Sequence, residues 1–226
     1  SDITEKLGQM IKNALIDVEP ATQRLVRCAA ERESSNMCKW ALEQISENNA
    51  VASKTRSYAC QDCGQAVIFA ELGQDVRVSG NLTDAINAGV ELGYADARKS
   101  VADPLTRINT KTNTPAVIHY NVVSGNELKI TYLAKGAGSE NMSKLFMLTP
   151  SKGENGIIDC VVQTVKDAGA NPCPPIVIGV GIGGTMEKCA LLSKKALTRE
   201  TGTFSKDERC AELERKILER VNATGI

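Results

Sequence analysis

The sequence has 226 residues, of which 42% are hydrophobic, so the chain can bury a substantial core and intrinsic disorder is not expected. Lys plus Arg and Asp plus Glu each number 27, and with a formal net charge of zero we expect neither nucleic acid nor a membrane as partner. No apolar run approaches the ~20 residues that span a bilayer and no basic-then-apolar leader is visible, so we expect a soluble, cytoplasmic protein.

Cysteine usage points to a reducing compartment. Eight cysteines are scattered along the chain, without the density of a secreted disulfide scaffold. For most of them burial as a small apolar residue is the default interpretation, and only local context singles out a ligand. The eight are Cys28, Cys38, Cys60, Cys63, Cys160, Cys173, Cys189 and Cys210.

The first 50 residues are predicted to form helices. Apolar residues recur at helical spacing from Ile3 to Val18, and Asp2 can cap that helix. Pro20 suits the first position of a second helix, and Ser35 can cap a third. We expect these helices to contribute to the core and to carry no chemistry.

After residues 46–49 the pattern changes to a mixture of strands and helices. Two alternating segments, 116–123 and 127–133, flank a turn that contains Gly125 and predict a β-hairpin. Ser205 and Glu208 form a capping box for the last helix. The remaining predictions are strands at 65–72, 76–78 and 176–180, and helices at 81–98, 157–168 with Gly169 at its end, and 185–197.

These elements predict an α/β fold of mixed type, in which N-terminal helices are followed by a mixed β-sheet flanked by helices. Strict parallel winding is not expected, because hairpin and helix-linked connections are mixed. We expect one domain over residues 1–226, with 1–50 as a helical N-terminal segment.

The first loop whose side chains could bind a metal or take part in catalysis is Ala59-Cys60-Gln61-Asp62-Cys63-Gly64. Two cysteines three positions apart can bind one metal ion or exchange dithiol for disulfide. A zinc site would need a second Cys or His pair, and none has suitable spacing. A thioredoxin-like site would place the pair at the start of a helix, whereas strand-like residues follow this loop.

The second loop runs through Asn171-Pro172-Cys173-Pro174-Pro175 and on to the glycines of 179–184. The prolines forbid helix and hold the Cys173 sulfur on a rigid turn, as a cluster ligand requires. The glycines match the dinucleotide pattern G-x-G-x-x-G. A Rossmann fold would place an acidic residue at a strand end about 20 positions on, but 199–202 lie in a loop between helices. Close backbone packing and an anion-facing helix start are the other interpretations.

Two further segments could bind an anion. Lys135-Gly136-Ala137-Gly138-Ser139-Glu140-Asn141 combines a lysine, small residues and a helix start, which suits a carboxylate or phosphate, or is a plain strand-to-helix turn. Arg98, at the end of the predicted helix 81–98, could clamp a carboxylate with two hydrogen bonds, or lie in solvent.

Five ordered motifs carry a family resemblance. They are Cys-Gln-Asp-x-Gly, Arg-x-Ser-x-x-Asp-Pro, Asn-Thr-x-x-Asn-x-Pro-Ala, Lys-Gly-x-Gly-Ser-Glu-Asn and Cys-Pro-Pro-Ile-x-x-Gly-x-Gly-Ile-Gly-Gly. Together they resemble the class I fumarase and tartrate dehydratase family, over about Ser53 to Ile226. The absence of a continuing C-terminal domain resembles the alpha subunit of the two-subunit form.

The resemblance implies a 4Fe-4S cluster held by three cysteines, with Cys60 and Cys173 as two of the ligands. The third family ligand lies further downstream, so we expect the sequence to be C-terminally truncated. Cys63 departs from the pattern because a threonine is usual at its position, and we expect it not to bind iron.

The resemblance also implies roles around an open iron that acts as the Lewis acid. Gln61 and Asp62 would contact the substrate, with Asp62 as the catalytic acid, and Arg98 would hold a carboxylate. Lys135, Gly136 and Gly138 would shape the same pocket. The catalytic base and further clamps are expected from a beta subunit, in a higher oligomer. His119, in a strand pattern, is expected to be structural.

The function implied is therefore reversible hydration of fumarate to L-malate, with a small dicarboxylate as substrate and an alpha subunit that is active only with its beta subunit. Dehydration of L-tartrate is the nearest alternative, because the quoted motifs are shared. A Rossmann-type nucleotide-binding module and a structural thiol-rich domain are alternatives from other classes.

Overall fold

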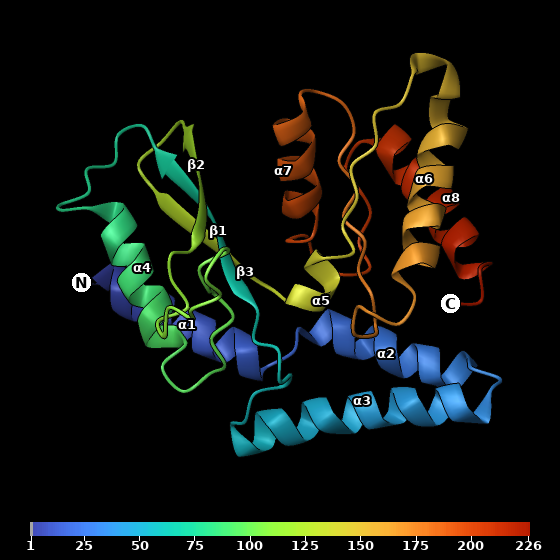
Figure 1. The fold of residues 1–226 in the computed structure, drawn as a ribbon, viewed down its shortest axis with the longest axis horizontal. Helices are drawn as coiled ribbons and strands as arrows, with labels where there is room; N and C mark the ends of the chain where they lie inside the picture. The colour runs from blue at the N-terminus through green and yellow to red at the C-terminus, as the bar shows by residue number, and fades with distance from the viewer. Residues whose placement is uncertain (1) are drawn as a thin grey trace. The chain divides into compact units, whose positions relative to one another are not determined.

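The computed structural model describes residues 2–226, which divide into two compact units between Ala137 and Gly138 (Figure 1). Elements of the first unit are α1 (Asp2–Ile16), α2 (Pro20–Arg32), α3 (Asn36–Thr55), β1 (Gln65–Gly73), α4 (Leu82–Gly93), β2 (Val117–Val123) and β3 (Leu128–Lys135). The short α5 (Ala137–Glu140) spans the division, and the second unit continues with η1 (Pro150–Lys152), α6 (Gly153–Ala168), α7 (Met186–Ala196) and α8 (Glu208–Asn222). The predicted α/β fold class is confirmed, while the single domain over 1–226 stays a prediction.

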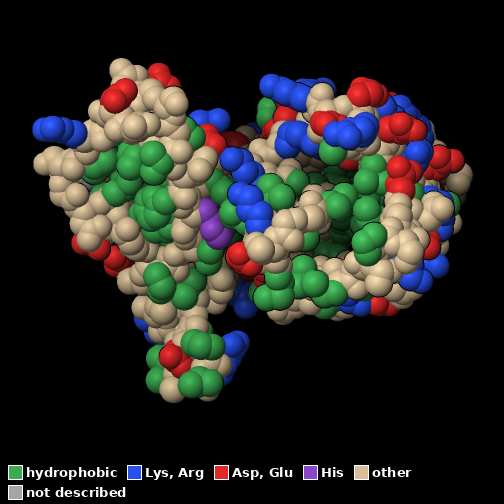
Figure 2. Space-filling view, turned by 90° about the horizontal axis from the view of Figure 1, so that it is seen from above, with side chains coloured by type: hydrophobic (Ala, Val, Ile, Leu, Met, Phe, Trp, Pro, Cys, Tyr) green, Lys and Arg blue, Asp and Glu red, His purple; other side chains and the backbone are tan. Residues whose placement is uncertain are grey.

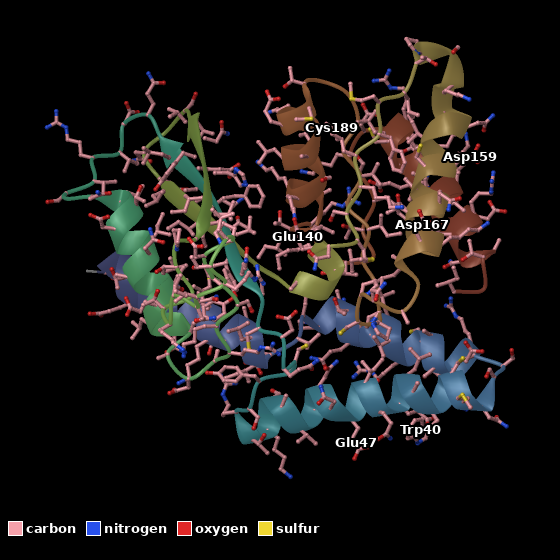
Figure 3. The ribbon with its side chains drawn as sticks, viewed as in Figure 1. Trp40, Glu47, Glu140, Asp159, Asp167 and Cys189 are labelled. Atoms are coloured by element: carbon pink, nitrogen blue, oxygen red, sulfur yellow. The ribbon has the colours of Figure 1, made fainter. Side chains whose placement is uncertain are left out.

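The N-terminal helices begin as predicted. Pro20 is the first residue of α2, and the Ser35 hydroxyl accepts a hydrogen bond from the Cys38 amide at the start of α3. α2 and α3 pack against each other, and Trp40 and Glu47 project from α3 on the side away from α2 (Figure 3).

The three-stranded sheet has the order β2-β1-β3, so the predicted hairpin is wrong although both of its strands exist. β1 lies between them, parallel to β2 and antiparallel to β3. The connection between β2 and β3 crosses the end of β1, where the Gly73 amide donates to the Glu127 carbonyl and the Gln74 amide to the Val123 carbonyl. Residues 66–70 are buried without alternation, as suits a central strand, whereas β2 and β3 have no fully buried residue.

Two boundary predictions around the sheet are also wrong. Residues 76–78 form no strand, because the chain turns after Gly73 and no neighbouring strand pairs with these residues. The helix predicted over 81–98 ends at Gly93, after a start at which the Asn81 side chain caps the amides of Thr83 and Asp84. Residues 98–116 are instead a long loop, closed by a single bridge between Ala102 and Asn109.

The core of the first unit lies between the sheet and the α1–α4 pair, which covers one face of it (Figure 1). Tyr94 is fully buried there, and its hydroxyl donates to the Cys63 carbonyl at 2.9 Å. The hydroxyl of Tyr132 lies 2.7 Å away and must donate to the Tyr94 oxygen, whose own proton is in use. Burial raises the pKa of Tyr94 to about 12 and also raises the pKa of Tyr132, so both hydroxyls stay protonated donors at neutral pH.

Tyr94→Phe should lower the free energy of unfolding by about 2 kcal/mol, because two buried polar groups lose their partner. Tyr120→Phe is the matched control, since the Tyr120 hydroxyl bonds Thr83 on the exposed surface and its loss should cost less than about 0.5 kcal/mol. Urea denaturation followed by circular dichroism measures both. Equal losses in the two variants would contradict the buried pairing.

In the second unit, α6 packs against α8 around Ile158, Val162 and Ile217. The predicted stop of α6 at Gly169 is confirmed. The capping box of the last helix is wrong, because Asp207 directly precedes α8 and its carboxylate accepts from the Arg209 and Cys210 amides.

The strand predicted at 176–180 is absent, and Ile176, Val177 and Ile178 are exposed. A β-branched apolar run becomes a strand only where a neighbouring backbone pairs with it. The chain instead approaches α7, since a Cβ on Gly179 would lie 2.1 Å from the Ser193 carbonyl oxygen.

Hydrophobic side chains are visible at several places on the molecular surface (Figure 2). Among residues 2–226, none of the helices has the length and apolar character needed to cross a membrane.

Candidate functional site

The Cys60–Gly64 loop joins α3 to β1 and is organised by the Asp62 carboxylate. Asp62 Oδ1 accepts hydrogen bonds from the Gly64 amide at 3.1 Å and from the Ser100 hydroxyl at 3.4 Å. Its Oδ2 accepts from the Ala137 amide at 2.9 Å. One side chain thus ties together the cysteine-bearing loop, the segment after Arg98 and the start of α5, three of the sequence motifs.

A second link comes from Asn113, which is fully buried. Its Oδ1 accepts from the amides of Ser100 at 2.6 Å and Val101 at 3.1 Å, and its Nδ2 donates to the Gly64 carbonyl at 3.1 Å. The sequence motif contained Asn113 and Ser100, but neither was predicted to be a site residue. The sequence alone could not reveal this link, because the hydrogen-bond partners of Asn113 lie in other segments of the chain.

Close backbone packing places the third segment beside the loop. Gly64 has φ +69°, and a Cβ on it would lie 2.6 Å from the Lys135 carbonyl carbon and oxygen and 2.8 Å from the Gly136 amide nitrogen. Only glycine allows this conformation and this approach. The structure therefore brings Gln61, Asp62, Arg98, Lys135 and Gly136 onto adjoining backbone segments of the first unit.

The two cysteines of this loop differ in environment. Cys60 is exposed, and its thiol donates to the neighbouring Gln61 Oε1 at 3.5 Å. Cys63 is buried, and its thiol donates to the Cys60 carbonyl. Burial raises the pKa of Cys63, although a hydrogen bond from the Arg98 backbone partly offsets this. Because metals bind thiolate, this favours the expectation that Cys63 is not a ligand.

The two remaining predicted site residues lie in the second unit. A Cβ on Gly138 would come within 2.8 Å of the Asn171 carbonyl oxygen, so the backbone at Gly138 is packed against the start of the proline-rich cysteine motif. Cys173, two residues beyond Asn171, has an exposed side chain. The glycine stretch 179–184 follows no strand, so a Rossmann module lacks the strand it requires at this point.

The cysteine side chains present can be compared with those that an iron-sulfur cluster requires as ligands. Iron clusters bind cysteine thiolates, and the two predicted ligands, Cys60 and Cys173, both have exposed side chains. Within residues 2–226 no three Cys, His, Asp or Glu side chains gather as a metal-binding group. The two thiols fit the chemistry of the cluster, as part of a ligand set and not as all of it.

His119, expected to be structural, stacks on Phe69 with ring centroids 5.2 Å apart.

Comparison with known proteins identifies the class and then the family. A family model described as fumarate hydratase (Fumerase) matches residues 4–226, so the protein is a hydro-lyase. The "Putative L(+)-tartrate dehydratase subunit alpha" of Methanocaldococcus jannaschii is 38% identical over 99% of this chain and 82% of its own length. L(+)-tartrate dehydratase subunit alpha of Escherichia coli (strain UTI89 / UPEC) is 30% identical over 87% of this chain and 67% of its own. The chain belongs to the fumarate hydratase (Fumerase) family.

Proposed function

We propose that this chain is the alpha subunit of a two-subunit iron-sulfur hydro-lyase that reversibly hydrates fumarate to L-malate. The observation that carries the proposal is the convergence of three motifs around Asp62. An exposed thiol, an amide, a carboxylate and a guanidinium are all borne by segments that this carboxylate and Asn113 tie together. These are the groups that a dicarboxylate hydro-lyase needs.

In this proposal Cys60 and Cys173 are two of the ligands of a 4Fe-4S cluster. When bound, the cluster supplies a Lewis-acidic iron for the hydroxyl and carboxylate of the substrate. Arg98 clamps a substrate carboxylate, since a guanidinium can donate two parallel hydrogen bonds to it. Lys135, Gly136 and Gly138 shape the pocket.

Asp62 is the acid that moves a proton during hydration and dehydration. Its Oδ1 already accepts two hydrogen bonds, whereas Oδ2 accepts one, from the Ala137 amide. A carboxylate oxygen has two lone pairs, so Oδ2 is the atom that can hold the transferable proton. Gln61, directly before Asp62, orients the substrate through its amide.

The beta subunit completes the site by supplying the catalytic base and further carboxylate clamps. The names of the relatives as alpha subunits support such a partner. A higher oligomer and a cytoplasmic location belong to the same proposal.

Dehydration of L-tartrate is the second candidate function, and a specific observation favours it. Both relatives described above carry the name of L(+)-tartrate dehydratase. The two reactions share the class of substrate and the elimination or addition of water, so the same groups of this chain serve both.

The full-length alpha chain, purified anaerobically with its beta subunit, tests the proposal. Iron and acid-labile sulfide should be present, and fumarate should be converted to L-malate faster than L-tartrate is dehydrated. The reverse order of rates would transfer the function to tartrate. Absence of both iron and sulfide, with no turnover of either substrate, would remove the iron-sulfur hydro-lyase proposal.

A further inference from the structure

We propose that Asn113 is a positioning residue, which fixes the carboxylate clamp Arg98 relative to Gln61 and Asp62. The inference deepens the proposed function and rests on it. Asn113 itself is 0% exposed and so cannot touch a substrate. It acts through the backbone on either side of the site.

The two ends of the link lie close to the proposed substrate groups. The amides of Ser100 and Val101 donate hydrogen bonds to Asn113 Oδ1, and these residues follow Arg98 by two and three positions. Gly64, whose carbonyl accepts from Asn113 Nδ2, follows Asp62 by two residues. Gly64, Ser100 and Val101 belong to no helix or strand, and side-chain links join the two segments to each other.

Asparagine suits this position for two separate reasons. Its backbone has φ +60°, in the left-handed region that asparagine and glycine adopt more readily than other residues. Its amide is both acceptor and donor, and the link uses both functions at once. Aspartate could keep the two bonds to Ser100 and Val101 but would place an acceptor against the Gly64 carbonyl. Glycine would keep the backbone and lose all three bonds.

The Ser100 hydroxyl reinforces the same link from the other side, through its contact with Asp62 Oδ1. The Arg98 segment is thus held to the Cys60–Gly64 loop by the buried Asn113 link, by the half-buried Ser100 hydroxyl and by the hydrogen bond from the Arg98 backbone to Cys63. A misplacement of about 1 Å between a clamp and a reacting group can lower a rate by about 10²-fold. Loosening the buried link should therefore change substrate affinity as well as turnover.

Asn113→Gly and Asn113→Asp, each assembled with the beta subunit, should raise the KM for fumarate about 10-fold and lower kcat/KM about 10²-fold. A purely structural role would reduce the active fraction, and so kcat, while KM stayed unchanged. Asn87→Asp is the matched control. Its side-chain amide likewise accepts from a backbone amide, of Ala116, and donates to a carbonyl, of Thr83, but neither bond involves the segments that carry Arg98, Gln61 and Asp62.

The proposal is overturned if Asn113→Asp and Asn113→Gly bind wild-type amounts of iron and keep the wild-type KM and kcat. It is also overturned if Asn87→Asp raises KM as much as they do. Failure of the wild-type complex to turn over fumarate or tartrate would instead count against the proposed function.

Hydrogen exchange of the unmodified alpha chain tests the link without activity and without any variant that must fold. The Ser100 and Val101 amides lie outside helices and strands, yet the bonds to Asn113 should slow their exchange at least 10-fold relative to the Arg77 and Ser79 amides of the exposed loop before α4. Equal exchange rates at the two places would show that the link is not formed.

Discussion

Replacing Cys60 with serine should abolish both the iron content and the activity of the alpha–beta complex while leaving the fold intact. The proposed cluster loses a thiolate ligand, and a metal centre supplies several kcal/mol of transition-state stabilisation, so kcat/KM should fall by about 10³-fold or more. Cys60 is exposed and its thiol hydrogen-bonds to the neighbouring Gln61, so the free energy of unfolding of the cluster-free alpha chain should change by less than about 0.5 kcal/mol. Iron and sulfide analysis, kinetics and a thermal melt measure the three effects.

Cys38→Ser is the matched control for this experiment. Cys38 is also an exposed free thiol, but it lies in the first turn of α3 and outside the motifs. It should retain iron, sulfide and turnover at wild-type levels. Cys173→Ser should behave like Cys60→Ser. If Cys60→Ser keeps its full iron content, or if Cys38→Ser loses as much iron, Cys60 is not a cluster ligand.

The local features of the fold could be predicted because each depends on residues close together in sequence. Helical periodicity and caps such as Ser35 and Pro20 located α1 to α3, and Gly169 located the end of α6. Asp207 was missed in favour of Ser205, although both are good capping residues. α8 begins at Glu208, so Asp207 holds the capping position, and the Ser205 hydroxyl accepts from the Asp207 amide instead.

The strand order could not be predicted, since it depends on pairing across the chain. Residues 116–133 have every local feature of a hairpin, yet β1 inserts between the two strands and pairs with both. Ile176 to Ile178 have strand composition but no strand partner among residues 2–226. Sequence patterns indicate a preference for extended backbone. Which other strand such a segment pairs with depends on the tertiary structure.

The candidate site shows the same division. Ordered motifs were sufficient to select Cys60, Asp62 and Arg98, but they could not show how the segments are held. The role of Asn113 depends on bonds to Gly64, 49 residues away in sequence. The structure also makes Asp62 a structural link between segments in addition to its predicted catalytic role.

Gly64→Ala should be strongly destabilising, with a loss of about 4 kcal/mol or more in the free energy of unfolding. Two effects add. The residue has φ +69°, which costs an alanine about 1 kcal/mol or more. Its Cβ would also lie 2.6 Å from the Lys135 carbonyl, a contact with backbone that no side-chain rotation can relieve.

Gly80→Ala separates these two effects. Gly80 has φ +94°, but nothing lies within 4 Å of the position its Cβ would take. It should therefore show the conformational cost alone, about 1–2 kcal/mol. Urea denaturation of both variants measures the difference, which isolates the close approach of the Cys60–Gly64 loop to Lys135 and Gly136. Because that approach also sets the spacing between Asp62 and the Lys135 segment, a Gly64→Ala chain that still folds should lose catalysis in the complex, whereas Gly80→Ala should keep it. Equal destabilisation of the two variants would mean that the loop and the end of β3 are not packed as closely as the structure has them.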